Sequence, residues 1–110
     1  MSVTRTFTVT VVNTGSGNKY FIDGVQQPTI SLAEGFTYRF DVSDSSMGAH
    51  PFKFSTTSNG THSGGTEYTT GVTTSGDTGQ SGAYVQIAVA ASAPTLYYYC
   101  QYHSGMGGQA

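Results

Sequence analysis

Three residues that bind soft metal ions follow one another at intervals of three near the end of the chain. They are Cys100, His103 and Met106, and they come directly after an aromatic run, Tyr97–Tyr99. A thiolate, an imidazole and a thioether on one short loop favour a single copper ion that alternates between Cu(I) and Cu(II). Such a site needs a second imidazole, and we expect His50 to supply it. All four are therefore candidate metal ligands.

Each candidate ligand also has an ordinary structural explanation. A lone cysteine is most often a small buried hydrophobe, and a lone histidine in a polar loop is more often exposed than bound to metal. The joint spacing of Cys100, His103 and Met106 favours metal binding over these separate explanations. The remaining histidine, His62, lies in a polar stretch, so we expect it to be exposed and leave it outside the site.

Length, composition and charge restrict the class of protein. A chain of 110 residues with 36% hydrophobic residues predicts one domain, residues 1–110, with a single core. Only 9% of residues are charged and the net charge is -2, so we expect no nucleic-acid partner. The single cysteine excludes an internal disulfide and a two-cysteine binuclear copper centre.

The sequence contains no apolar run that approaches the roughly 20 residues needed to cross a bilayer, so we expect no membrane span. The first residues lack the apolar region of a signal peptide, and we expect any export signal to have been removed or never to have existed. A surface of uncharged polar residues favours a periplasmic, extracellular or particle-associated protein.

Short alternating runs rich in Val, Thr, Tyr and Phe, separated by turn-forming residues, predict β-structure throughout. Strands are expected near residues 3–12, 19–22, 29–32, 36–42, 50–54, 67–72, 83–89 and 95–100. Seven to eight such strands indicate an all-β fold, a two-sheet sandwich or a barrel. The polar, glycine-rich residues 55–82 are expected to form a long loop that is functional, ordered by its own contacts or mobile.

Alternation also predicts which side chains face the core. In the strand 36–42, the inward residues should be Phe36, Tyr38, Phe40 and Val42. In the last strand, Tyr98 shares the face of Cys100 and should pack beneath the site, whereas Tyr97 and Tyr99 should point outward. A solvent-facing Tyr99 bonded to Cys100 could conduct an electron, although an ordinary cross-strand aromatic is at least as good an explanation.

With this ligand order the chain resembles the cupredoxins, and its Cys100-x2-His103-x2-Met106 loop is similar to that of their short-loop members, the amicyanin and pseudoazurin type. The resemblance implies a Greek-key β-sandwich that carries one mononuclear type 1 copper near one end. We therefore expect an electron-transfer protein that is monomeric and meets a redox partner protein of unknown identity. Because the four ligands leave no open coordination position, we do not expect an enzyme.

Two residues depart from the pattern of that family. Family members commonly have Asn after the upstream histidine, whose backbone N–H donates to the cysteine sulfur, but this chain has Pro51, which has no N–H. Short-loop members commonly have Pro two residues after the cysteine, but this chain has Tyr102. We expect the Tyr102 N–H to provide the hydrogen bond to the Cys100 sulfur instead.

Two other functions remain open at this point. Residues 55–72 resemble a loop of cupredoxin-like domains from marine bacteria and phages, which favours a structural or adhesion module of a larger surface or phage particle protein that retains its copper site. Copper storage or delivery would instead favour an exposed, exchangeable Cu(I) site with several thioethers, and Met47 could be one of them beside Met106.

Overall fold

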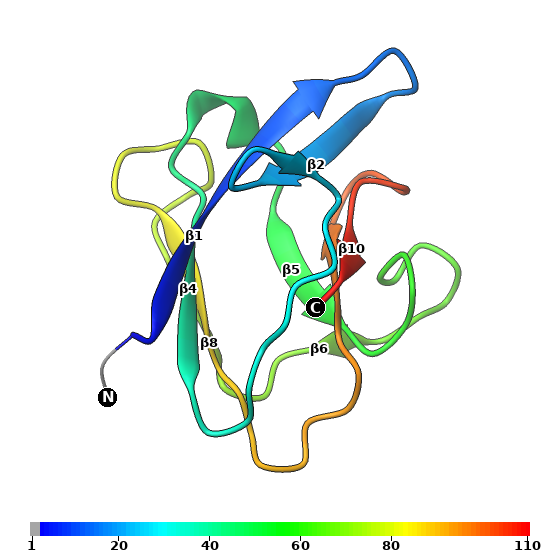
Figure 1. Cartoon of the computed structure of the whole chain (residues 1–110). Coiled ribbons are helices and arrows are strands. Elements are labelled where there is room, and N and C mark those ends of the chain that lie inside the picture. The colour runs from blue at the N-terminus through cyan, green and yellow to red at the C-terminus, as the bar shows by residue number, and fades with distance from the viewer. Residues whose placement is uncertain (1–2) are drawn as a thin grey trace.

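The computed structural model describes residues 3–110, which form two β-sheets packed against each other (Figure 1). The larger sheet has the strand order β3-β2-β1-β4-β8-β7, and the smaller sheet has the order β10-β9-β5-β6. The strands are β1 (Arg5–Asn13), β2 (Asn18–Ile22), β3 (Val25–Gln26), β4 (Thr37–Asp41), β5 (Phe52–Ser55), β6 (Glu67–Tyr68), β7 (Val72–Ser75), β8 (Tyr84–Ala88), β9 (Tyr97–Cys100) and β10 (Gly108–Gln109), with one short 3-10 helix, η1 (Ser45–Met47).

This architecture confirms the prediction of an all-β sandwich. Ten strands occur within residues 3–110, but β3, β6 and β10 have only two residues each. The chain leaves the larger sheet after β4, forms β5 and β6 in the smaller sheet, and returns for β7 and β8 before β9. In the part of the chain that the structure describes, no helix is long and apolar enough to cross a membrane.

Alternation along the strands determines which side chains form the core. In β1, Phe7 and Val9 are buried between the sheets. The intervening threonines Thr6 and Thr8 are exposed. In the β8 segment, the alternate residues Ala83, Val85, Ile87 and Val89 are all buried. Burial of one face of each strand stabilises the sandwich because it removes apolar surface from water.

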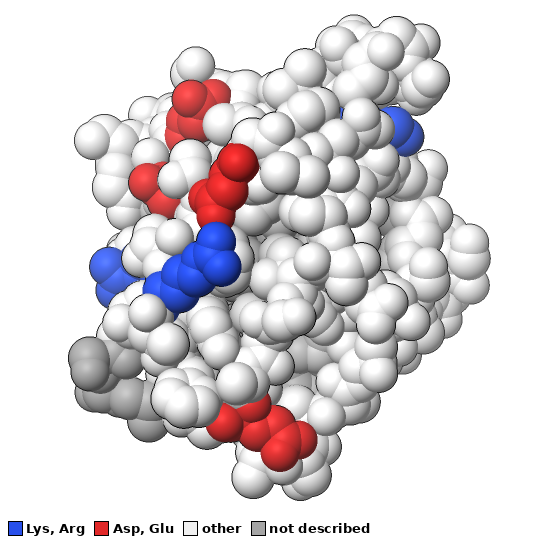
Figure 2. Space-filling view, viewed as in Figure 1, with Lys and Arg blue, Asp and Glu red and all other residues white. Residues whose placement is uncertain are grey.

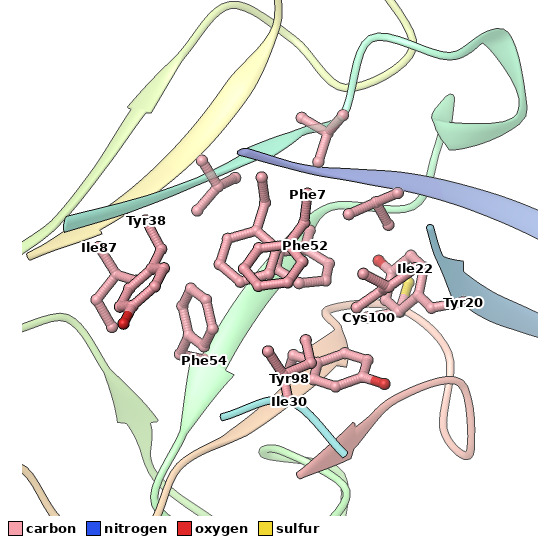
Figure 3. Close-up of a cluster of buried hydrophobic side chains, with 14 of the residues drawn as sticks. Phe7, Tyr20, Ile22, Ile30, Tyr38, Phe52, Phe54, Ile87, Tyr98 and Cys100 are labelled. Atoms are coloured by element: carbon pink, nitrogen blue, oxygen red, sulfur yellow. The ribbon is translucent and has the colours of Figure 1, made fainter. Parts of the chain in front are cut away.

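The centre of the core is a group of packed aromatic rings (Figure 3). The ring centroid of Phe40 lies 5.1 Å from that of Phe52 and 5.4 Å from that of Phe54. Phe52 also stacks on Tyr98 at 5.6 Å. These contacts join β4 of the larger sheet to β5 and β9 of the smaller one, and so fix the strands that carry the candidate ligands.

Three details of the predicted strands are wrong. Residues 29–32 form no strand. The Ile30 N–H donates to the Gln109 carbonyl at 2.9 Å, but this single bond is not continued by the regular series of hydrogen bonds that defines a strand pair. Phe36 is 50% exposed, since it follows a turn and precedes the start of β4. The single strand expected near 67–72 is two strands, β6 and β7, because a turn at Gly71 (φ 71) carries the chain between sheets.

The pairing of β5 with β9 brings the predicted site residues to one end of the sandwich. The two strands are antiparallel, and Phe52 lies opposite Cys100 in the register. His50 precedes Phe52 by two residues, while His103 and Met106 follow Cys100. The beginning of β5 and the end of β9 therefore lie side by side, and the loops that continue from them meet there.

Candidate metal centre

Three of the four predicted ligands come together at this end of the sandwich. The Cys100 Sγ lies 3.7 Å from Nδ1 of His50 and 3.4 Å from Nδ1 of His103. The potential ligand atoms of the three residues all lie within 4.8 Å of one another. The two imidazole centroids are 4.8 Å apart. The three side chains therefore form one group that could hold a metal ion.

The separations of the sulfur from the two nitrogens fit bonds to one metal ion. Bonds of about 2.3 Å to sulfur and about 2.0 Å to nitrogen, meeting at about 120°, would separate sulfur from nitrogen by about 3.7 Å. The observed separations of 3.7 and 3.4 Å are close to that value. A thiolate with two imidazoles suits copper or zinc, so this donor set fits a metal ion without selecting between the two.

Met106, the fourth predicted ligand, follows His103 on the same loop and is buried, with 1% of its surface exposed. The Tyr20 N–H donates to its backbone carbonyl at 3.0 Å, which ties residue 106 to β2. Ligation by its sulfur remains a prediction. Met47 is also fully buried, in the hydrophobic core, which disfavours the exposed thioether cluster that copper storage would need.

The three converging residues differ in their access to solvent. Cys100 is fully buried, His50 is half-buried and His103 is exposed. Partial burial, followed by the positive charge that His103 can carry, lowers the pKa of His50 below its ordinary value. The neutral imidazole, which is the form that binds metal, is therefore favoured at this position.

The loop that carries His50 is held from inside the molecule by Tyr20. The hydroxyl of this fully buried tyrosine donates to the carbonyls of His50 (2.9 Å) and Pro51 (3.1 Å). The Gln101 N–H also donates to the Pro51 carbonyl, at 3.2 Å. Figure 3 shows Tyr20 beside Cys100, and burial together with this neighbouring thiol raises the pKa of Tyr20. Pro51 lacks an N–H, but its carbonyl connects the two ligand-bearing loops.

The predicted hydrogen bond from the Tyr102 N–H to the Cys100 sulfur is not found. The hydrogen-bond partners found for this sulfur within residues 3–110 are the His50 and His103 rings and the Tyr20 side chain, and none of them is a backbone N–H. Tyr102 is 64% exposed. We therefore correct this expectation: neither residue 51 nor residue 102 supplies a backbone donor to the sulfur.

The outer face of β9 also differs from the prediction. Tyr98 is buried on the face of Cys100, as expected, but Tyr99 is only 2% exposed. A polar segment, which includes Gly60 and His62, covers the Tyr99 ring. Tyr99 is therefore not the solvent-facing conduit that alternation predicted, because a loop far away in the sequence packs on it.

The same segment contains a residue whose role the sequence did not indicate. His62 is half-buried rather than fully exposed, and its Nε2 lies 2.7 Å from the carbonyl oxygen of Cys100. His62 is not part of the group that could hold a metal ion, which consists of His50, Cys100 and His103. No local sequence pattern links residues 62 and 100, which are 38 positions apart.

Comparison of the chain with protein-family models, curated proteins and solved structures gives no match. The chemistry of the site is therefore the basis on which a function can be inferred.

Proposed function

We propose that this protein is a cupredoxin-like electron carrier with one type 1 copper ion. The observation that supports this proposal most strongly is the convergence of the Cys100 sulfur and the Nδ1 atoms of His50 and His103. One thiolate with two imidazoles and a weak axial thioether is the ligand set of blue copper sites. The β-sandwich and the order of the ligands along the chain support the same assignment.

Copper is favoured over zinc by the fourth candidate donor. Structural zinc sites use thiolates, imidazoles and carboxylates, whereas the soft thioether of a methionine suits copper. Met106 is buried and follows His103 on the same loop. Copper held by these residues would carry one electron as it alternates between Cu(I) and Cu(II).

The surrounding chain supports electron transfer rather than bond chemistry. Cys100 is fully buried and Met106 nearly so, which limits the access of water or a substrate to these donors. The His50 loop is fixed through the Tyr20 hydroxyl, so little rearrangement is needed when the charge at the site changes. A rigid site whose four ligands come from the protein is suited to an electron carrier.

His103 is the proposed point at which electrons enter and leave. It is exposed, and its neighbours Tyr102, Ser104 and Gly105 are uncharged and exposed too. Figure 2 shows that charged side chains are few and scattered on the face it presents. Beside the loop of His103, one charged group is present: the Lys19 ammonium donates to the Gly105 carbonyl at 2.9 Å. A redox partner that approaches the imidazole edge would therefore desolvate few charged groups, chiefly the Lys19 ammonium.

The proposal is tested by adding one equivalent of Cu(II) to the purified protein. We expect an intense thiolate-to-copper absorption band near ~600 nm, reversible voltammetry, and loss of the band in Cys100→Ser. His62→Gln is the matched control and should keep the band, since residue 62 is not a ligand. The proposal fails if the wild-type protein shows no such band or if the Cys100→Ser variant retains it. A band without reversible voltammetry would instead favour a structural module that retains copper.

A further inference from the structure

Residues 57–66, which we call the clasp, cover the outer face of β9 beside the metal centre. This segment follows β5, precedes β6 and appears as the green loop on the right of Figure 1. The clasp packs closely on the sheet at Gly60, where a Cβ atom would overlap the Tyr99 ring. Gly60 also has a positive φ of 62°, which favours glycine. The clasp and Tyr99 are therefore packed directly against each other.

The clasp is ordered by hydrogen bonds that do not involve the ligand loop. The Thr57 hydroxyl donates to the Gly60 carbonyl at 2.8 Å and accepts from the Thr66 N–H at 3.1 Å. The fully buried Ser55 donates to the Thr57 carbonyl at 2.6 Å. A Cβ at Gly65 would overlap the Gly60 carbonyl oxygen and the Thr57 hydroxyl. The clasp is thus a loop with a defined internal structure rather than an unstructured polar linker.

Two side chains of the clasp reach the backbone of the ligand loop, residues 100–106, at its two ends. The Nε2 of His62 lies 2.7 Å from the carbonyl oxygen of Cys100. Because a carbonyl oxygen only accepts, this nitrogen carries the proton and donates. At the other end, the Oδ1 of Asn59 accepts from the Gly105 N–H at 2.8 Å. The segment between these bonds contains His103, the exposed candidate ligand.

We propose that Asn59 and His62 are positioning residues, which hold the ligand loop in its metal-binding shape from outside the sheet. The inference rests on the proposed copper function. Pro51 cannot donate an N–H to the neighbouring loop, and the Tyr102 N–H makes no bond to the sulfur among those found in residues 3–110. In place of such backbone hydrogen bonds to the sulfur, the clasp provides two hydrogen bonds to the ligand loop, which span 46 and 38 positions of the sequence.

Four variants test this role, in two matched pairs. Asn59→Gly removes the acceptor but accommodates the positive φ of 63° at this position, whereas Asn59→Asp keeps an acceptor oxygen. His62→Phe keeps a ring against Tyr99 but removes the donor, whereas His62→Gln keeps an N–H donor. Ser63→Ala, at an exposed neighbouring position, is the control for substitution in the clasp.

The first measurement is amide hydrogen exchange of residues 101–106 in the metal-free protein. We expect faster exchange in Asn59→Gly and His62→Phe, and near wild-type exchange in Asn59→Asp, His62→Gln and Ser63→Ala. The second is copper affinity together with the reduction potential. Mutation of a residue that hydrogen-bonds a metal ligand typically lowers metal affinity by about 10-fold or more. We therefore expect a loss of that size in copper affinity, and a shifted reduction potential, in Asn59→Gly and His62→Phe alone.

The outcomes separate this inference from the proposed function. If the two disabling variants fold and leave both the exchange of residues 101–106 and the copper affinity at wild-type values, the positioning role is refuted. Loss of metal binding without rescue by Asn59→Asp or His62→Gln also refutes it. If wild-type protein lacks the thiolate-to-copper band, the proposed function fails, while hydrogen exchange in the metal-free protein still decides whether the clasp holds the ligand loop.

Discussion

Replacing Tyr20 by phenylalanine should weaken both the fold and the metal centre. The substitution removes only a hydroxyl, which donates to the carbonyls of His50 at 2.9 Å and Pro51 at 3.1 Å. The Pro51 carbonyl keeps a second donor, the Gln101 N–H at 3.2 Å. The His50 carbonyl has no other donor among the hydrogen bonds found in residues 3–110. The change therefore leaves one acceptor unsatisfied, without opening a large cavity.

The expected size of this effect follows from that count. One unsatisfied buried polar group costs about 1–3 kcal/mol. His50 is only half-buried, so water can reach it, and we expect a loss of about 1–2 kcal/mol in the free energy of unfolding. For a domain of this size such a loss lowers Tm by roughly 4 to 15 °C. Because His50 is then less well fixed, copper affinity should fall by about 10-fold.

The assay compares Tyr20→Phe with Tyr98→Phe. The Tyr98 hydroxyl also donates to a backbone carbonyl, that of the half-buried Pro28 at 2.7 Å, but this bond does not involve a ligand-bearing loop. Urea unfolding of the metal-free proteins should show similar losses for both variants. Only Tyr20→Phe should lower the copper affinity in a competition titration. Equal copper affinities of the two variants would refute the positioning role of the Tyr20 hydroxyl.

Three further substitutions or conditions test the fold and the electrostatics of the site. Gly60→Ala should destabilise the protein by about 1–3 kcal/mol more than Gly64→Ala in urea unfolding, because both glycines have positive φ but only a Cβ at Gly60 meets the Tyr99 ring. Phe40→Ala should cost about 3–5 kcal/mol, against under about 1 kcal/mol for Phe36→Ala, since Phe40 is fully buried and Phe36 is 50% exposed; equal losses would contradict the described core. The folded-state pKa of His50 is lowered, so its contribution to stability should be present above about pH 6.5 and decrease as the pH falls below it. Urea unfolding of the metal-free wild type and His50→Gln at pH 7.5 and 5.5 measures this contribution. The free energy of unfolding of the wild type, relative to that of His50→Gln, should be lower at pH 5.5 than at pH 7.5, and an unchanged or higher relative value would contradict the prediction.

Local pattern was sufficient for much of the fold. Alternation along residues 36–42 identified Tyr38, Phe40 and Val42 as buried because one face of this strand lies on the core. It failed for Tyr99, since alternation predicts faces of a sheet but does not predict that a distant loop covers the outer one. It also failed for residues 29–32, where a buried Ile30 lies in extended chain without a strand ladder.

Three residues of the candidate site could also be predicted from the sequence, because their positions follow from local spacing and from strand pairing. Cys100 and His103 are close in the chain, and His50 reaches them through the pairing of β5 with β9. The contacts that hold these residues in place could not be predicted from the sequence. Tyr20 is 30 positions from His50, and His62 is 38 positions from Cys100. An ordinary tyrosine in a strand and a histidine in a polar loop have no local signature for such contacts, which depend on how the two sheets and the clasp pack.

X-ray absorption spectroscopy of the copper-loaded protein tests the central claim most directly, because it reports the atoms bound to the metal. The proposal predicts one short copper–sulfur bond and two imidazole nitrogens in the wild-type protein. It also predicts that the short sulfur contribution disappears in Cys100→Ser. A copper environment of nitrogen and oxygen alone in the wild-type protein, or a short sulfur contribution that persists in Cys100→Ser, would contradict the assignment of His50, Cys100 and His103 as the ligands of a type 1 copper site.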